Sequence, residues 1–329
     1  MGEATRIEWC DATWNPVRGC SPVSEGCRHC YAMGVAARFS APGMPYAGLA
    51  RRVNGHPAWT GEVRLVPEAL DLPLRWRKPR RIFVNSMSDL FHEKLRDAEI
   101  AAVFAVMAIA TQHTFIVLTK RAARMREWVG TTDNREHEVG EIVRLGTSGA
   151  ESGLLEWPLP NVVLGVSVEN QATADARIPE LLATPAACRA VSYEPALVPV
   201  DFQAWLGRAA TLCAACGLKF GHGTMIGGTG CRGLDWIVVG GESGPRARPC
   251  DLAWIRSTVR QCREAGIACF VKQLGASVIA ATSGPVLRAR KGGDPSEWPE
   301  DDLRVQEWPS LRVALGVPAP GERPIWRLR

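Results

Sequence analysis

Three cysteines lie close together near the start of the chain. Cys20, Cys27 and Cys30 fall within eleven residues in the spacing C-x6-C-x2-C, and Tyr31 follows the last of them. Three thiolates on one loop can ligate three irons of a [4Fe–4S] cluster, because cysteine sulfur is the usual protein ligand of such clusters. No fourth ligand is evident nearby, so the fourth iron would stay open for a substrate or cofactor, as the open position of a catalytic zinc does.

The same cysteines are compatible with other sites. A zinc ion could use them with His29, Cys10 or a distant residue as its fourth ligand, and the two-residue gap between Cys27 and Cys30 occurs in zinc knuckles as well as in iron–sulfur loops. Unliganded thiols are a third interpretation. The six-residue gap, with glycines beside it, favours a loop curled around something larger than one ion.

The composition is that of a globular protein, with 46% hydrophobic and 22% charged residues, and 329 residues suffice for one large domain or two ordinary ones. The longest apolar stretch, Ile100–Ala110, is too short to cross a bilayer, and the N-terminus has no apolar signal core. Eleven cysteines without a signal peptide favour a reducing compartment and metal ligation over disulfides. We therefore expect a cytoplasmic protein with no membrane partner.

The net charge of +5, from 39 basic and 34 acidic residues, permits a nucleic-acid partner without demanding one. Two basic clusters stand out, Arg75–Arg81 and Lys120–Arg126. They could contact DNA or RNA, or they could be ordinary solvated charges at helix ends and loops.

Short β-branched runs alternate with helical stretches along most of the chain. A first strand is expected within residues 7–16, and six runs follow: Arg81–Asp89, Thr114–Lys120, Asn161–Asn170, Cys188–Pro195, Asp235–Ser243 and Ala268–Gln273. Helical spacing occurs in Tyr31–Phe39, Asp97–Ala110, Ala122–Val129, Ala172–Leu182 and Leu252–Ala265. This alternation predicts an α/β fold with a parallel sheet. About seven such units are enough for a partial or complete (β/α) barrel.

The strand runs end in polar residues. Active sites of parallel α/β sheets lie at the carboxyl ends of the strands, so we expect these side chains to converge with the cysteine loop on one mouth. They are Ser86, Ser88, Asp89, Thr119, Lys120, Ser167, Glu169, Asn170, Ser192, Glu194, Glu242, Ser243, Lys272 and Gln273. The alternative for each is a helix N-cap, a role that Ser, Asp and Asn suit.

Several segments break the alternation. Residues 205–233 carry Cys213, Cys216, His222 and Cys231 among many glycines, which resembles a small zinc-binding insertion; a loop with spare thiols is the alternative. Residues 40–60 look like a long surface connection, and residues 130–158 look like an irregular loop that could cover the mouth. We expect residues 1–275 to form the barrel and residues 276–329 to form a C-terminal extension.

The cysteine loop, the aromatic residue after it and the polar strand ends together resemble the radical S-adenosylmethionine (SAM) enzymes, although the usual spacing there is C-x3-C-x2-C. More specifically, the chain is similar to the phage Gp37/Gp68 family, a radical-SAM-like group. The matching segments are Thr13–Cys20, Cys27–Ala32, Asn85–His92, Gly165–Asn170, Val191–Pro195, Gly240–Pro245 and Lys272–Gln273.

The resemblance implies a barrel of the radical SAM type with roles for particular residues. Cys20, Cys27 and Cys30 would hold the [4Fe–4S] cluster, and SAM would chelate the fourth iron. The residues implied to bind SAM are Tyr31, Ser86, Ser88, Asp89, Ser167, Glu169 and Asn170. Lys120 would pair with the SAM carboxylate, and Glu194 and Glu242 would be left for substrate or proton transfer.

The implied activity is reductive cleavage of SAM to a 5′-deoxyadenosyl radical, which abstracts hydrogen from a substrate that the sequence does not identify. A nucleic acid undergoing repair or modification is one such substrate. An electron donor of the flavodoxin or ferredoxin type is the implied partner. The alternative function is a non-enzymatic, zinc-binding module that interacts with nucleic acid.

Overall fold

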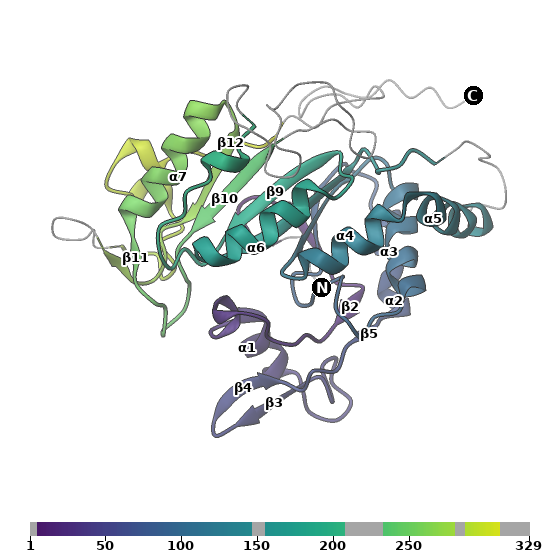
Figure 1. The fold of residues 1–329 in the computed structure, drawn as a ribbon. Helices are drawn as coiled ribbons and strands as arrows, with labels where there is room; N and C mark the ends of the chain where they lie inside the picture. Colours follow the sequence, from purple (N-terminus) through teal and green to yellow (C-terminus); the bar gives the residue numbers. More distant parts are fainter. Residues whose placement is uncertain (1–4, 147–154, 208–232, 280–286, 310–329) are drawn as a thin grey trace.

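Seven parallel strands form one sheet in the order β1-β6-β7-β8-β9-β10-β12 (Figure 1). They are β1 (Ala12–Trp14), β6 (Arg81–Val84), β7 (Thr114–Thr119), β8 (Val162–Val168), β9 (Cys188–Tyr193), β10 (Trp236–Gly240) and β12 (Ala268–Gln273). All adjacent pairs are parallel. The computed structural model describes residues 5–146, 155–207, 233–279 and 287–309. Within these ranges the predicted α/β fold is confirmed as a mixed α/β half-barrel.

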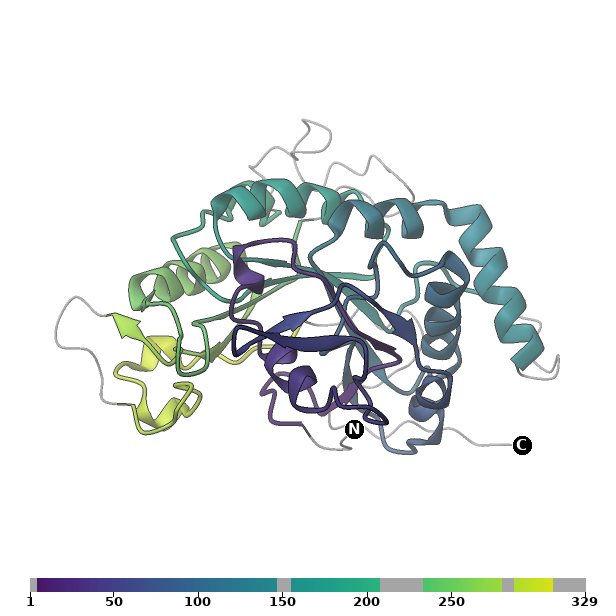
Figure 2. The ribbon, with the colours of Figure 1, turned by 90° about the horizontal axis from the view of Figure 1, so that it is seen from below.

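Helices cover the outer face of the sheet. They are α3 (Asp97–Ile109), α4 (Ala122–Gly130), α5 (Thr132–Gly146), α6 (Gln171–Leu182) and α7 (Leu252–Ala265). Figure 2 shows them as an arc around the strands, with the N-terminal segment lying across the opposite, inner side. The central strands β8, β9 and β10 are buried at nearly every position, so both of their faces are covered, whereas β1 and β6 alternate between buried and partly exposed residues. The helices expected from spacing are confirmed to within two residues of their ends.

Aromatic side chains fill the inner face of the half-barrel. Trp9 meets Trp236 edge to face, with ring centroids 5.9 Å apart, and Trp236 meets Phe270 in the same way. Residues 287–309 return to this region, where the Trp308 indole N–H donates to the Trp9 carbonyl and the Val271 amide donates to Val305. The segment after β12 is thus packed onto the sheet.

The connections from β1 to β6 form a small cap of short elements at one end of the sheet (Figure 1). The cap contains β2 (Val17–Arg18), paired with β5 (Arg64–Leu65), and α1 (Tyr31–Arg38), which contacts the hairpin of β3 (Ala50–Val53) and β4 (His56–Trp59). The remaining short elements are η1 (Glu25–Cys27), α2 (Pro67–Leu70), η2 (Leu72–Arg75), η3 (Gln203–Trp205), β11 (Cys250–Asp251), β13 (Val278–Ile279), η4 (Pro295–Glu297) and η5 (Asp301–Leu303).

Two expectations about connections are wrong. Residues 40–60 contain the β3–β4 hairpin, whose turn places Asn54 and Gly55 at positive φ (50° and 78°), the geometry that Asn-Gly turns favour. Residues 132–146 are not a loop over the mouth but helix α5, which packs beside α3 in the outer layer. The predicted insertion falls largely on residues 208–232, so Cys213, Cys216, His222 and Cys231 lie outside the described residues.

Close packing at the centre of the sheet predicts a contrast between two glycines. A Cβ on Gly165 of β8 would lie 2.6 Å from Leu118 Cδ2 and 2.8 Å from the Ala190 carbonyl oxygen, whereas a Cβ on Gly140 of α5 would meet nothing within 4 Å. We expect Gly165→Ala to lower the free energy of unfolding by about 1–3 kcal/mol through overpacking. Gly140→Ala should raise it by about 0.5–1 kcal/mol, because alanine favours helix. Urea unfolding measures both, and equal effects would contradict this packing.

Candidate functional site

The cysteine loop, residues 20–30, lies across the carboxyl ends of four strands. It follows a parallel bridge between Gly19 and Ser88, beyond β6. Further along the loop, polar contacts reach Arg121 after β7, Glu169 after β8 and Glu242 after β10. The predicted convergence of the loop with the strand ends at one mouth therefore holds for these four strands.

All three cysteines of the loop are free and partly exposed. Burial raises the pKa of Cys20 to about 12, and negative charge on Asp89, Cys30 and Cys27 acts in the same direction. The three thiols are thus near enough for their charges to affect one another. A bound metal would lower the pKa of such a thiol instead, because a thiol that coordinates a metal is deprotonated. Within the described ranges, no three His, Cys, Asp or Glu side chains are grouped as they would be around a metal ion.

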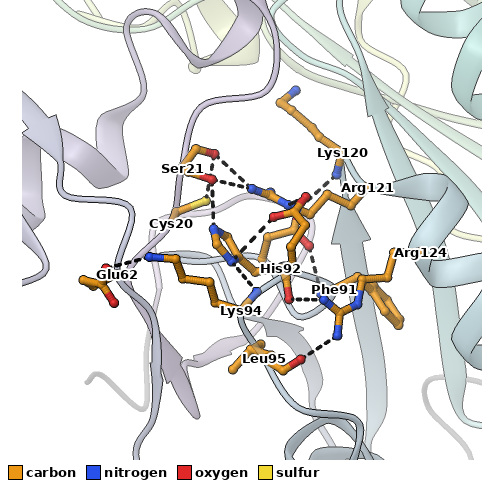
Figure 3. A network of polar contacts seen from close by, with 12 residues as sticks. Cys20, Ser21, Glu62, Phe91, His92, Lys94, Leu95, Lys120, Arg121 and Arg124 are labelled. Atoms are coloured by element: carbon orange, nitrogen blue, oxygen red, sulfur yellow. Dashed lines mark hydrogen bonds and ion pairs between the residues drawn. The ribbon is translucent and has the colours of Figure 1, made fainter.

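A buried arginine fastens the start of the loop to the sheet (Figure 3). Arg121, 7% exposed, donates from Nη2 to the Ser21 carbonyl (3.2 Å) and to Ser21 Oγ (2.8 Å). Its Nη1 donates to Asp89 Oδ2 (3.1 Å), and its Nε donates to Glu93 Oε1 (2.7 Å). One guanidinium therefore joins the loop to the turn after β6.

Asp89 is engaged by four protein donors. Its Oδ1 accepts from the Phe91 amide (3.0 Å) and from Thr119 Oγ1 (2.7 Å). Its Oδ2 accepts from the Lys120 amide (3.2 Å) and from Arg121. The carboxylate ties β6 to β7 and balances the charge of Arg121, so within the described fold it anchors the turn after β6.

His92 supports the same corner. Its Nδ1 accepts from the Lys94 amide (3.2 Å), which leaves the proton on Nε2, where Ser21 Oγ lies 2.9 Å away (Figure 3). Burial and the nearby Arg121 lower the pKa of His92. The neutral imidazole of His92 thus donates from Nε2 to the hydroxyl of Ser21, the residue after Cys20.

Glu169 holds the middle of the loop from beneath. Fully buried, it pairs with Lys120 Nζ (3.3 Å) and with Arg177 Nη1 (3.0 Å), and it accepts from the Gly26 amide (3.3 Å). A Cβ on Gly26 would lie 2.9 Å from Glu169 Cδ, so the approach requires glycine. Burial alone would raise the pKa of Glu169, but the charge of Lys120, with that of Arg177 among the smaller causes, holds it below its ordinary value.

Glu242 holds the end of the loop in a similar way. Its Oε2 lies 3.1 Å from His29 Nδ1, and both oxygens accept from the Arg248 guanidinium, the shorter bond being 2.6 Å. Arg248 also donates to the carbonyl and the carboxylate of Glu25, each at 3.0 Å. Burial opposes ionisation, but the hydrogen bonds from Arg248 and His29 lower the pKa of Glu242.

A second polar group lies on β9 and β12, away from these anchors. Lys272 Nζ is 2.8 Å from Glu194 Oε1, and Ser192 Oγ donates to Glu194 Oε2 (3.1 Å). The side chains of Glu194 and Lys272 keep 13% and 19% of their surface exposed. Both side chains of this ion pair are thus partly exposed.

The other predicted cofactor residues are mostly used within the fold. Tyr31, half exposed, donates its hydroxyl to the Ser86 carbonyl (2.6 Å). Ser88 Oγ donates to the Val17 carbonyl (2.8 Å) and Asn170 caps α6 through the Thr173 amide (2.8 Å). Ser86 Oγ donates to Asn15 Oδ1, and the Ser167 carbonyl accepts from Arg177 Nη1. For Asn170 the helix-cap alternative is the one that the structure shows.

Sequence reasoning missed most of the side chains that fasten the loop. Arg121, Arg177, Arg248 and His92 are not assigned to the site by the sequence, and His29 enters there only as a possible zinc ligand. Arg121 stood within a basic cluster whose alternatives were nucleic-acid contact and solvation, yet it points inward. The one signal in the sequence was its place directly after a strand end, beside Lys120.

Most cations of the two basic clusters have partners, although Arg77 and Lys78 are exposed and form no ion pair among the described residues. Arg75 pairs with Asp71 (2.6 Å), and Arg81 pairs with Asp11 (2.8 Å) and lies over the Trp308 ring. In the second cluster Lys120 and Arg121 are turned into the site, and Arg124 donates to the carbonyls of His92 and Leu95. Arg126 pairs with Glu180.

Fold and site together define an α/β protein whose N-terminal cysteine loop is fastened to the carboxyl edge of an open parallel half-barrel. The chain belongs to the family DUF5131, described as a protein of unknown function, whose model matches residues 4–297. Neither the curated proteins nor the solved structures contain a match to it. Among the helices of the described chain, none has the length and apolar character needed to cross a membrane.

The contacts of Arg121 with Ser21, Asp89 and Glu93, here called the clamp, predict that removing the guanidinium lowers stability and exposes the loop. Arg121→Met leaves Asp89 buried without its cation and should cost about 3–5 kcal/mol of unfolding free energy. The Cys20 thiol should also react faster with a thiol reagent, because Ser21 is released. Arg121→Lys should recover only part of both effects, since lysine lacks the fork. Arg126→Met, on an exposed pair, is the control; unchanged thiol labelling in Arg121→Met would contradict the clamp.

The lowered pKa of Glu169 predicts a pH dependence. A carboxyl whose pKa is depressed on folding stabilises the protein above its unfolded pKa, near 4.5, and loses that contribution as the pH falls through the folded value. Glu169→Gln should therefore be less stable than the parent at pH 7, and the difference should narrow in acid below about pH 4.5. Urea midpoints across this range measure the effect, with Glu180→Gln as the surface control. A constant difference at all pH values would refute the assignment.

Proposed function

We propose that this protein is a radical SAM enzyme. The observation that carries the proposal is the position of three free thiols on one loop, held at the carboxyl mouth of a parallel half-barrel by buried ion pairs. Active sites in such sheets lie at this edge. The chemistry of the donor set suits an iron–sulfur cluster, because Cys20, Cys27 and Cys30 lie on one loop and none is committed to a disulfide.

In this proposal Cys20, Cys27 and Cys30 hold a [4Fe–4S] cluster, and a bound cluster with SAM would supply the one-electron cleavage that generates a 5′-deoxyadenosyl radical. Protein residues provide position and charge. Lys120 and Arg121 bring positive charge beside the loop, which offsets thiolate charge. The aromatic packing around Trp9 and Trp236 fills the inner face at the amino ends of the strands.

The remaining polar residues divide into two roles. Glu169 and Glu242 orient the loop, since cations and loop amides already occupy their oxygens. Glu194 and Lys272 form the accessible pair that can take or give a proton at the substrate. In this proposal Glu169 and Glu242 position the loop, and Glu194 and Lys272 take part in catalysis.

Anaerobic reconstitution with iron and sulfide tests the proposal. We expect about four irons per chain with a brown absorbance, and 5′-deoxyadenosine released on reduction with SAM. Cys20→Ala, Cys27→Ala and Cys30→Ala should each lose both. Cys262→Ala, which removes a buried thiol from α7, is the matched control and should keep both. Zinc in place of iron, or iron retained in all three loop variants, would overturn the proposal.

A further inference from the structure

The cap beside the mouth carries an unusual excess of positive charge. Residues 26–61, which include α1 and the β3–β4 hairpin, contain four arginines and no Asp or Glu. Six arginines of the cap and its border have no carboxylate partner among the described residues: Arg18, Arg38, Arg51, Arg52, Arg64 and Arg246. Elsewhere the arginines of the basic clusters are mostly paired. The cap therefore carries several exposed arginines whose charge no neighbouring carboxylate balances among the described residues.

Two of these arginines face each other directly. Arg18 of β2 and Arg64 of β5 are opposite partners in an antiparallel ladder. Both guanidinium groups reach the Pro45 carbonyl, at 3.4 and 3.0 Å, and Arg18 also lies over the Tyr46 ring. Like charges directly opposite each other destabilise a sheet unless an anion lies between them. Each guanidinium keeps further N–H groups that a phosphate could accept.

The hairpin extends the charge along the cap. Arg51 and Arg52 on β3 are exposed, and the exposed His56 at the start of β4 lies 2.9 Å from Arg246, in the segment after β10. That contact joins the hairpin to the segment that carries Arg248. Arg248 in turn contacts the cysteine loop by donating to the Glu25 carbonyl. The basic surface thus borders the proposed active site.

Exposed aromatic rings accompany the arginines. Tyr31 is 50% exposed at the start of α1, and Phe39 is 45% exposed directly after its end. Arginines that neutralise a backbone, together with rings that can stack on bases, are the combination that binds single-stranded nucleic acid. Arginine rather than lysine also suits phosphate, because its planar fork binds two oxygens.

We propose that the basic surface formed by Arg18, Arg51, Arg52 and Arg64 of the cap and by Arg246 on its border binds the phosphate backbone of single-stranded nucleic acid and leads it to the mouth. The binding is independent of any cofactor. That the bound strand is also the substrate rests on the proposed function. This surface replaces the two basic clusters, whose cations are mostly paired, as the region of nucleic-acid contact.

Fluorescence anisotropy with labelled single strands of about 20 nucleotides, as DNA and as RNA, tests the binding. We expect affinity to fall with salt concentration. Arg18→Ala/Arg64→Ala should weaken binding by on the order of tenfold or more. The plot of log K against log salt concentration should become less steep by about 1.4, because two phosphate contacts are lost and each contributes about 0.7 on a single strand. The control Arg126→Ala/Arg144→Ala removes the same charge from paired surface arginines and should leave both values unchanged.

Further measurements keep the proposal open to refutation. If the first double variant fails to fold, Arg51→Ala/Arg52→Ala on the exposed hairpin should show the weaker binding instead. Absence of salt-dependent binding, equal weakening in the control, or binding to phosphatidylserine vesicles or polyglutamate but not to nucleic acid would overturn it. The protein with all three loop cysteines changed to alanine should still bind, so failure of the cluster and failure of this surface are distinguishable.

Discussion

The arrangement of the mouth depends on buried charge. Arg121 and Asp89 are both almost excluded from water, and each has its remaining hydrogen-bonding groups satisfied by neighbours. Removing such a pair from water is costly, and the cost is offset only when all partners are in place. The loop residue Ser21 is one of those partners. The first part of the cysteine loop is therefore stable in this position only when the ends of β6 and β7 are correctly joined.

The loop has little structure of its own to determine its shape. Its only helical turn is η1, and its course is fixed by contacts with Glu169 and Glu242, which hold the amide of Gly26 and the ring of His29. The carboxylates at the strand ends therefore hold the loop in position. This arrangement places three thiols at one mouth although they are separated by as many as ten positions in the sequence.

Much of the fold follows from the sequence, because a buried parallel strand is an apolar run and its polar end marks the carboxyl edge. The individual roles do not follow, because they depend on which cation reaches which carboxylate, a tertiary property. Asp89 and Glu169 look alike as strand-end acids whether they bind a ligand or an arginine. The missed elements did have local signals: Asn54-Gly55 is a hairpin turn, and α5 carries Arg135–Glu138 and Glu141–Arg144 at helical spacing.

The open edge of the sheet bears on the size of a ligand that the mouth could admit. An eight-stranded closed barrel leaves room inside for side chains or one small ligand, whereas here β1 and β12 are the edges of the described sheet and do not pair with each other. The cysteine loop occupies the mouth over β6 to β10, and the accessible Glu194–Lys272 pair lies toward the β12 side. A polymer that follows the arginines of the cap, joined to the β10 side through His56 and Arg246, would approach that pair without threading through a closed ring.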